Sequence, residues 1–224
     1  MINKLITLLL RLPENSIKKI IRDIFYGEII SERVVEYALA FFHLGTDPAS
    51  KTKILDIGCY FSNFPIQLAS MGYRVFAIDL MDYQLTHPNF KFVKGDITKY
   101  KFPPDYFDIV TCISTLEHIG LGFYEGDVKD ERGDVKTIKA IKRVLKKGGR
   151  FIFTVPFGKK SVNSIQRVYN AEDLSEILSG FRIEKELFYK EKERKWLSAS
   201  KKDVSNVVSR NKTKAIVFIS ARKI

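Results

Sequence analysis

Two apolar segments, residues 53–60 and 73–79, constrain the fold of this chain more than any other part of its sequence. The first contains Asp56-Ile-Gly58, a stretch of helical length follows, and the second ends in Asp79. This order predicts a strand, a tight turn, a helix and a second strand, the arrangement that builds a nucleoside pocket. Gly58 allows the backbone to approach a ligand where a Cβ would intrude. Asp79, about 20 residues on, stands where a carboxylate accepts hydrogen bonds from ribose hydroxyls.

The turn after the first strand separates two kinds of nucleoside ligand. A dinucleotide fingerprint uses Gly-x-Gly-x-x-Gly around a pyrophosphate, but the later glycine positions hold Tyr60 and Asn63, whose side chains would crowd one. An acidic residue before the turn, Asp56, suits a cationic ligand. The segment therefore resembles the first motif of the class I S-adenosylmethionine (SAM)-dependent methyltransferases, which starts Asp-x-Gly, and a nicotinamide oxidoreductase is disfavoured.

The later segments follow the order of that family. Residues 91–97, 107–114 and 150–156 are predicted as strands three to five, and residues 134–147 as an amphipathic helix. Residues 181–189 and 214–221 fit the closing antiparallel pair of strands. The resemblance thus implies an α/β fold: a seven-stranded Rossmann-like sheet, mostly parallel with the last strand antiparallel, with helices on both faces and an N-terminal helical extension.

Two departures from the family pattern are visible. The first motif keeps only the first of the usual glycines, which leaves the methionine end of the pocket partly unassigned. Only about a dozen residues separate the second strand from the third, and His87-Pro88 marks a turn between them. The helix that usually joins these strands is therefore expected to be vestigial.

We expect two regions: an N-terminal helical lid over residues 1–48 and the methyltransferase domain over residues 49–224. Residues 31–43 have apolar positions at helical spacing, and residues 1–28 have another amphipathic pattern. The second pattern fits a lid helix, a dimer contact or a membrane-surface helix, and both it and the oligomeric state stay open. No apolar run reaches the ~18 to 20 residues of a membrane span.

The cysteine content and the net charge of the chain bear on its cellular location and on its binding partners. Cys59 and Cys112 are expected to be buried thiols in a reducing compartment, so a cytoplasmic location is predicted. The formal net charge is +12, and residues 185–224 hold 12 Lys or Arg against 4 Asp or Glu. Such a face could bind RNA, with Tyr189 and Trp196 as stacking platforms. It could equally be a solvated lysine-rich surface, which is favoured because no RNA-binding module is present.

The resemblance implies roles for individual residues. Asp79 and Leu80 would hold the ribose, Asp96 and Ile97 the adenine, and Ser114 would lie under the sulfonium. His118 directly follows the fourth strand, at the edge where open α/β sheets bind ligands, and is the candidate general base. The loop under the methionine portion of SAM would consist of Asp56, Gly58, Cys59 and Tyr60.

Signatures that the sequence lacks narrow the range of possible methyl acceptors. The Asn/Asp-Pro-Pro-Tyr signature of amino-methylating enzymes is absent after strand four, and residues 155–157 hold no Cys nucleophile. Of the methyl-transfer reactions that remain, oxygen methylation of a small or carbohydrate-like acceptor is the favoured one. Glu117 beside His118 suggests a magnesium site, because some methyltransferases place Glu and His ligands in this segment. Ser114 occupies the position of the first ligand in those enzymes, so no metal site is predicted. The alternatives are an RNA methyltransferase and a catalytically silent SAM-fold binding protein.

A glycine-rich insertion of about 14 residues, 120–133, follows this segment at the ligand edge of the predicted sheet. It is longer than an ordinary connection and combines four glycines with four acidic side chains. We expect it to be a polar loop that contacts the substrate.

Overall fold

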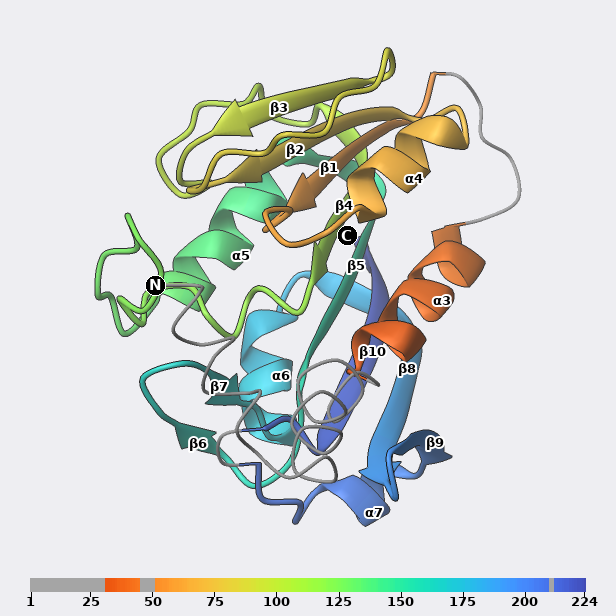
Figure 1. The fold of residues 1–224 in the computed structure, drawn as a ribbon, viewed down its shortest axis with the longest axis vertical. Coiled ribbons are helices and arrows are strands. Elements are labelled where there is room, and N and C mark those ends of the chain that lie inside the picture. The colour runs from red at the N-terminus through yellow and green to blue at the C-terminus, as the bar shows by residue number, and fades with distance from the viewer. Residues whose placement is uncertain (1–30, 45–50, 210–211) are drawn as a thin grey trace, which may run out of the picture.

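The computed structural model describes residues 31–44, 51–209 and 212–224, and Figure 1 shows their arrangement. The helices and strands are α3 (Arg33–Leu44), β1 (Lys53–Ile57), α4 (Phe64–Ser70), β2 (Arg74–Asp79), β3 (Phe90–Lys94), β4 (Phe107–Ile113), α5 (Gly133–Val144), β5 (Leu145–Pro156), β6 (Ser161–Val162), β7 (Arg167–Val168), α6 (Ala171–Ile177), β8 (Phe181–Lys192), β9 (Lys195–Ala199), α7 (Lys201–Val204) and β10 (Ala215–Lys223).

Eight of these strands form one sheet in the order β3-β2-β1-β4-β5-β10-β8-β9. The first five are parallel to one another, and β10 is antiparallel to both β5 and β8. The α/β sheet and its antiparallel last strand are thus confirmed. Because the carboxyl ends of parallel strands meet at one edge, this topology places the ends of β1 to β4 around a common site.

The expected count of seven strands is wrong, because β9 adds an eighth at the edge beside β8. The two strands are joined by a two-residue turn, Glu193 and Arg194, whose φ angles are 51° and 65°. Positive φ at both central residues is the geometry of a type I′ hairpin, which usually takes Asn and Gly. The sequence carries neither residue there, so the usual hairpin signal is missing.

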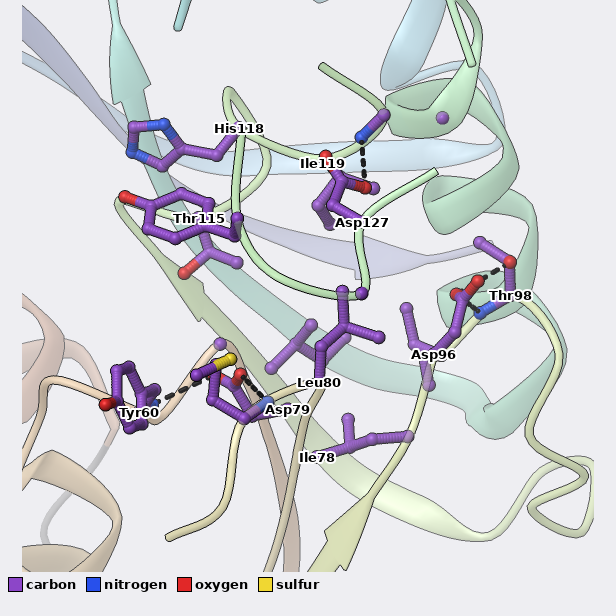
Figure 2. Close-up of a pocket in the computed structure, with 18 of the residues that line it drawn as sticks. Tyr60, Ile78, Asp79, Leu80, Asp96, Thr98, Thr115, His118, Ile119 and Asp127 are labelled. Atoms are coloured by element: carbon purple, nitrogen blue, oxygen red, sulfur yellow. Dashed lines mark hydrogen bonds between the residues drawn. The ribbon is translucent and has the colours of Figure 1, made fainter. Parts of the chain in front are cut away.

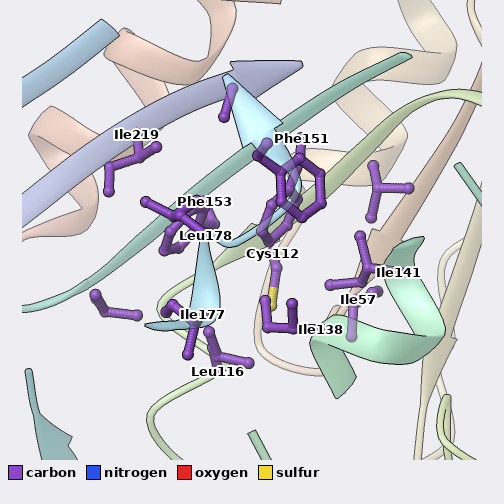
Figure 3. Packing of buried hydrophobic residues seen from close by; sticks show 14 of the residues in the cluster. Ile57, Cys112, Leu116, Ile138, Ile141, Phe151, Phe153, Ile177, Leu178 and Ile219 are labelled. Carbon is purple, nitrogen blue, oxygen red and sulfur yellow. The ribbon is translucent and has the colours of Figure 1, made fainter. Parts of the chain in front are cut away.

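Helices cover both faces of the sheet (Figure 1). On one face, α3 and α4 pack over apolar residues such as Ile54 and Ile152, and on the other face α5 and α6 pack over their sequence neighbours Leu55 and Phe151. Adjacent strand residues point to opposite faces, so strands buried on both sides read as continuous apolar runs. Figure 3 shows the second cluster, in which the rings of Phe151 and Phe153 stack with centroids 4.6 Å apart.

The boundary between α5 and β5 differs from the expected one. The helix was expected to reach residue 147, but it ends at Val144, and β5 begins at once with the fully buried Leu145. The register with β4 shifts between Phe107 and Ile109, and Gly148 has a φ of 72°. The glycines therefore form an irregularity inside the strand, after which β5 pairs regularly.

Other local expectations are confirmed. No helix joins β2 to β3, where the backbone N–H of Phe90 donates to the carbonyl of His87 in a turn. Asn170 followed by Ala-Glu-Asp predicts a capped helix start, and its side chain does cap α6 in a capping box with Asp173. The predicted helix over residues 31–43 is α3, whereas the amphipathic pattern of residues 1–28 and the boundary near residue 48 lie outside the described residues.

Within the described ranges, no helix combines the length and the apolarity needed to cross a membrane.

Candidate functional site

A cavity of about 310 Å³ opens at the carboxyl ends of β1, β2 and β4, beside the segment that follows β3. Figure 2 shows residues from these four places facing it. Eight of the ten residues predicted for the site line the cavity: Gly58, Tyr60, Asp79, Leu80, Asp96, Ile97, Ser114 and His118.

Gly58 makes the turn at the end of β1. Its φ is +82°, and a Cβ at this position would lie 2.2 Å from the side chain of Thr115. Both observations require glycine, because a larger residue strains the backbone and meets a neighbouring side chain. The turn therefore holds the end of β1 directly against the segment that follows β4.

The Asp79 carboxylate is held at the end of β2 by two backbone N–H groups. One oxygen accepts from Tyr60 at 2.9 Å and the other from Met81 at 2.9 Å (Figure 2). Each oxygen keeps further acceptor capacity, because an ionised carboxylate offers about four lone-pair sites. The group is thus fixed in the cavity wall with acceptor sites left for a ligand.

Asp96 and Ile97 form the far end of the cavity, after β3. One Asp96 oxygen accepts from the backbone and the hydroxyl of Thr98 at 2.8 and 2.7 Å, and the other lies 3.2 Å from the Lys99 ammonium. Ile97 is buried and presents an apolar surface to the cavity. This combination of a fixed carboxylate and an apolar face suits a flat heterocycle with an amino group.

His118 lies at the opposite end, beyond β4. Its Nδ1 is 2.6 Å from the carbonyl oxygen of Ile165, so Nδ1 carries the proton in the neutral ring and Nε2 is left as the acceptor. Burial lowers the pKa of His118. The imidazole is therefore neutral near pH 7 with a basic nitrogen available. The Tyr124 ring meets it edge-on, with ring centroids 5.5 Å apart.

Two buried glutamates stand behind this end of the cavity. Glu36, from α3, is hydrogen-bonded to the Ser114 hydroxyl, whose oxygen lies 2.8 and 2.7 Å from the two carboxyl oxygens. Glu117 has one oxygen 3.8 Å from His118 Nε2 and the other buried without a hydrogen-bond partner. Burial raises the pKa of each glutamate to about 8, so both are largely protonated near neutral pH. Among the described residues, no group of three metal-ligating side chains is present.

Two predicted site residues, Asp56 and Cys59, do not line the cavity. Asp56 lies inside β1 and its carboxyl accepts a hydrogen bond from the Thr111 hydroxyl at 2.6 Å. Burial raises the pKa of Asp56 to about 7. Cys59 is completely buried. Both residues therefore support the turn at Gly58 from behind the cavity wall.

The glycine-rich insertion, residues 120–133, forms a loop with closed ends. The backbone N–H of Asp130 donates to the Gly120 carbonyl at 2.9 Å, and a Cβ on Gly120 would lie 2.2 Å from the Asp130 oxygen. Arg167, which is buried, donates to the carbonyl of Ile119 at 2.6 Å and to those of Asp130 and Glu131. The loop thus has a fixed base and carries Tyr124 to the cavity.

Two cavity residues could not be found by motif reasoning, Arg33 and Tyr124. Arg33 precedes β1 by a whole helix, and Tyr124 lies in a loop with no periodic pattern. The available signals were indirect: Ser31, a favourable N-cap residue shortly before Arg33, and the unusual length of the insertion.

Solved structures that share this fold include 1,6-didemethyltoxoflavin-N1-methyltransferase from Burkholderia thailandensis, with bound 1,6-didemethyltoxoflavin and S-adenosylhomocysteine. It is 17% identical, with a TM-score of 0.59 and coverage of 97% of this chain and 88% of that chain. Phosphoethanolamine N-methyltransferase 2 from Haemonchus contortus, in complex with SAM, is 19% identical with a TM-score of 0.61, covering 90% of this chain and 55% of that chain. The [4+2]-cyclase SpnF is 16% identical with a TM-score of 0.58, covering 86% and 83%.

At these identities the likeness establishes the fold, which is that of the class I methyltransferases. A search of curated proteins finds no match. Residues 86–221, more than half of the chain, match a family model described as "Caenorhabditis protein of unknown function, DUF268". The chain therefore belongs to the DUF268 family and has the class I methyltransferase fold.

Proposed function

We propose that this protein is a SAM-dependent methyltransferase that methylates an oxygen of a small or carbohydrate-like acceptor. The observation that carries the proposal is the meeting of the Gly58 turn, the Asp79 carboxylate and the Asp96–Ile97 pair in one cavity. These three features come from the ends of β1, β2 and β3, where a nucleoside is bound in open α/β sheets.

The residues present fit the cofactor. Asp79 offers lone pairs to the two ribose hydroxyls, and Ile97 with Asp96 offers an apolar face and an acceptor to adenine. Gly58 keeps the floor of the cavity free of a side chain. Tyr60 and Ser114 border the part left for the methionine portion, while Asp56 and Cys59 shape the loop from behind.

SAM supplies an electrophilic methyl group on a sulfonium. The protein has to place an acceptor oxygen in line with it, exclude water and remove the hydroxyl proton. His118 Nε2 is the group that takes this proton, because its Nδ1–H is engaged by the Ile165 carbonyl. Tyr124, held against His118, forms the wall that positions the acceptor.

Binding of the cofactor is tested by calorimetry with SAM, S-adenosylhomocysteine and NAD. We expect binding of the two adenosyl ligands and none of NAD. Replacing Asp79 by alanine should weaken both adenosyl ligands by roughly 1 to 3 kcal/mol, the range for a hydrogen bond lost in a buried site. Asp82→Ala is the matched control, because Asp82 is exposed and pairs with Lys94 outside the cavity lining. Equal binding by the wild type and Asp79→Ala would remove Asp79 from the ribose role.

A binding protein without methyl transfer is the second candidate. SpnF, which has this fold, is named as a cyclase, so the fold by itself does not imply methyl transfer. Turnover of SAM to S-adenosylhomocysteine with an acceptor library discriminates the two: binding without turnover for any acceptor favours the silent protein.

The charge pairing of the C-terminal strands supports a small acceptor over RNA. Glu184, Glu186 and Glu191 of β8 pair with Arg222, Lys201 and Lys214. These cations are therefore partly neutralised within the protein, which lowers their value as phosphate contacts.

A further inference from the structure

A line of aromatic rings leads from His118 to the surface of the protein. The His118 ring meets Tyr124 edge-on with centroids 5.5 Å apart, and Tyr124 meets Phe123 edge-on with centroids 5.1 Å apart. Tyr124 lines the cavity, and Phe123 is 53% exposed. Edge-to-face contacts of this kind are a favoured arrangement of aromatic pairs. The candidate base therefore has an ordered aromatic wall beside it.

A second pair of rings borders the same cavity. Tyr60 and Phe61 both line it, with ring centroids 4.2 Å apart, and Phe61 is 75% exposed. Figure 2 shows Tyr60 and His118 both far from Asp96, which marks the end assigned to adenine. Large apolar side chains that stay exposed around a cavity are typical of a binding surface. The end of the cavity away from the adenine therefore has aromatic borders from two different loops.

The hydroxyl groups that precede His118 in the cavity wall are engaged within the protein. The Thr115 hydroxyl donates to the carbonyl of Ile113 at 3.0 Å, and the Ser114 hydroxyl is hydrogen-bonded to Glu36. A carbohydrate presents several hydroxyls that lose their water on binding, and each one left without a partner costs free energy. This end of the cavity therefore suits a ligand that carries few polar groups on an apolar body.

The candidate base is a weak one. Burial lowers the pKa of His118, and the positive charge of Arg33 lowers it further. The rate of a proton transfer falls as the acceptor hydroxyl becomes less acidic relative to the base. A phenolic hydroxyl has a pKa of about 10, whereas an alcoholic hydroxyl holds its proton nearly as tightly as water, whose pKa is about 15.7. His118 is therefore better matched to a phenol than to a sugar hydroxyl.

We propose that the methyl acceptor is a hydroxylated aromatic compound, bound with its ring against Tyr124 and Phe61 and its hydroxyl at His118 Nε2. The assignment rests on the proposed function and selects one class among its small acceptors. The phenolic oxygen forms a bond to the methyl carbon of SAM while the carbon–sulfur bond breaks, and the electron pair of that bond stays on sulfur. The phenolic proton goes to His118 Nε2 and then to water, which leaves S-adenosylhomocysteine and an aryl methyl ether as products.

The test uses probes that differ in the ring: 2-naphthol, its saturated counterpart decahydro-2-naphthol, and methyl glucoside. Calorimetry on the full chain, in the presence of S-adenosylhomocysteine, measures binding of each probe, and labelled SAM measures methyl transfer to each. We expect 2-naphthol to bind about 2- to 10-fold more tightly than its saturated counterpart, the range of an aromatic contact. Methyl transfer should favour 2-naphthol over both alcohols, because the alcohols hold their protons more tightly.

Two leucine variants test the aromatic borders. Tyr124→Leu and Phe61→Leu keep an apolar side chain and remove the ring, so each should weaken binding of 2-naphthol about 2- to 10-fold. Binding of decahydro-2-naphthol and of S-adenosylhomocysteine should change less than about twofold, because neither depends on these rings. Phe42→Leu is the matched control, since Phe42 is a phenylalanine of α3 that is 80% exposed and does not line the cavity. It should bind every ligand like the wild type.

The outcomes separate this assignment from the proposed function. If 2-naphthol binds no more tightly than its saturated counterpart, or if Tyr124→Leu and Phe61→Leu both bind it like the wild type, the assignment is overturned. Methyl transfer to methyl glucoside or to the saturated alcohol in preference to 2-naphthol also overturns it, while the methyltransferase function stands. If the wild type does not bind S-adenosylhomocysteine, the proposed SAM site itself fails.

Discussion

The hydroxyl of Ser114 lies 2.8 and 2.7 Å from the two carboxylate oxygens of Glu36, 78 positions earlier in the chain. Ser114 directly follows β4 and Glu36 is on the buried face of α3, so this contact joins the helix to the ligand edge of the sheet. Ser114 has a φ of 44°, a conformation that persists only where the surroundings hold it. The Glu36 carboxyl is therefore part of what fixes the cavity floor.

Glu36 should make the protein less stable as the pH rises. Its pKa is raised from 4.5 to about 8 by burial, so the folded state binds the proton more tightly than the unfolded state. The stabilising contribution is complete below pH 4.5 and is lost as the pH rises through about 8. Glu36→Gln stays neutral and should lose less stability between pH 5 and 9. Chemical denaturation at several pH values across this range measures the free energy of unfolding of both proteins. Glu193→Gln, in an exposed turn, should retain the wild-type dependence, and parallel curves for wild type and Glu36→Gln would contradict the prediction.

Replacing Gly58 by alanine should destabilise the fold by roughly 2 to 4 kcal/mol, because the new Cβ meets Thr115 and the backbone φ is positive. Gly148→Ala is the matched control. Its φ is +72°, but nothing lies within 4 Å of the added Cβ, so only the backbone penalty of about 1 kcal/mol applies. Urea denaturation of the two variants isolates the steric part. Equal losses would show that Thr115 moves aside freely.

His118 should titrate below its ordinary pKa of 6.5, because burial disfavours the imidazolium. Nitrogen-15 NMR should also show the neutral ring with its proton on Nδ1, as the contact with the Ile165 carbonyl requires. As a base, His118 would then lose activity only at pH values below 6.5. His118→Asn assigns the signal and, once an acceptor is found, should lower the methyl-transfer rate about 10²- to 10⁴-fold. A proton on Nε2 instead would argue against the base role.

Arg167→Met should loosen the loop of residues 120–133. The buried guanidinium donates to the carbonyls of Ile119, Asp130 and Glu131, at both ends of this loop. Its loss removes these hydrogen bonds, and only the Asp130 carbonyl keeps another donor, the backbone N–H of Gly133. Limited proteolysis should cut the variant within the loop several times faster than the wild type. Lys160→Met is the control, since Lys160 is an exposed residue paired with Asp173. Cleavage at the same rate in both variants would mean that the closed glycine base is sufficient.

The order of strands could be predicted because each one carries its own local signal. Continuous apolar runs mark strands buried on both faces, and Gly58, Asp79 and Asp96 stand where β1, β2 and β3 end. Since parallel strands share one ligand edge, residues that are distant in sequence are placed together by topology alone.

The features of the fold and the site that could not be predicted depend on contacts between distant segments, or on backbone conformations that are unusual for the residue types present. β9 follows a turn of Glu193 and Arg194, which lacks the usual turn residues. Arg33 joins the cavity only because α3 docks through Glu36 and Tyr37. Asp56 contacts Thr111 inside the sheet and does not face the cavity. Side chains alternate between the two faces along β1, and the motif does not specify which face Asp56 occupies.

The eighth strand, β9, also determines which strand edge of the sheet is exposed to other chains. Without β9, the outer edge of β8 would expose backbone donors and acceptors along 12 residues, a template for intermolecular pairing. β9 covers the part from Phe188 to Lys192, and the uncovered part carries Arg182, Glu184, Lys185 and Glu186. The new edge is five residues long and begins with Lys195. A short edge and a charged remainder both oppose edge-to-edge pairing with other chains, and the hairpin turn at Glu193 and Arg194 is what places β9 on this edge.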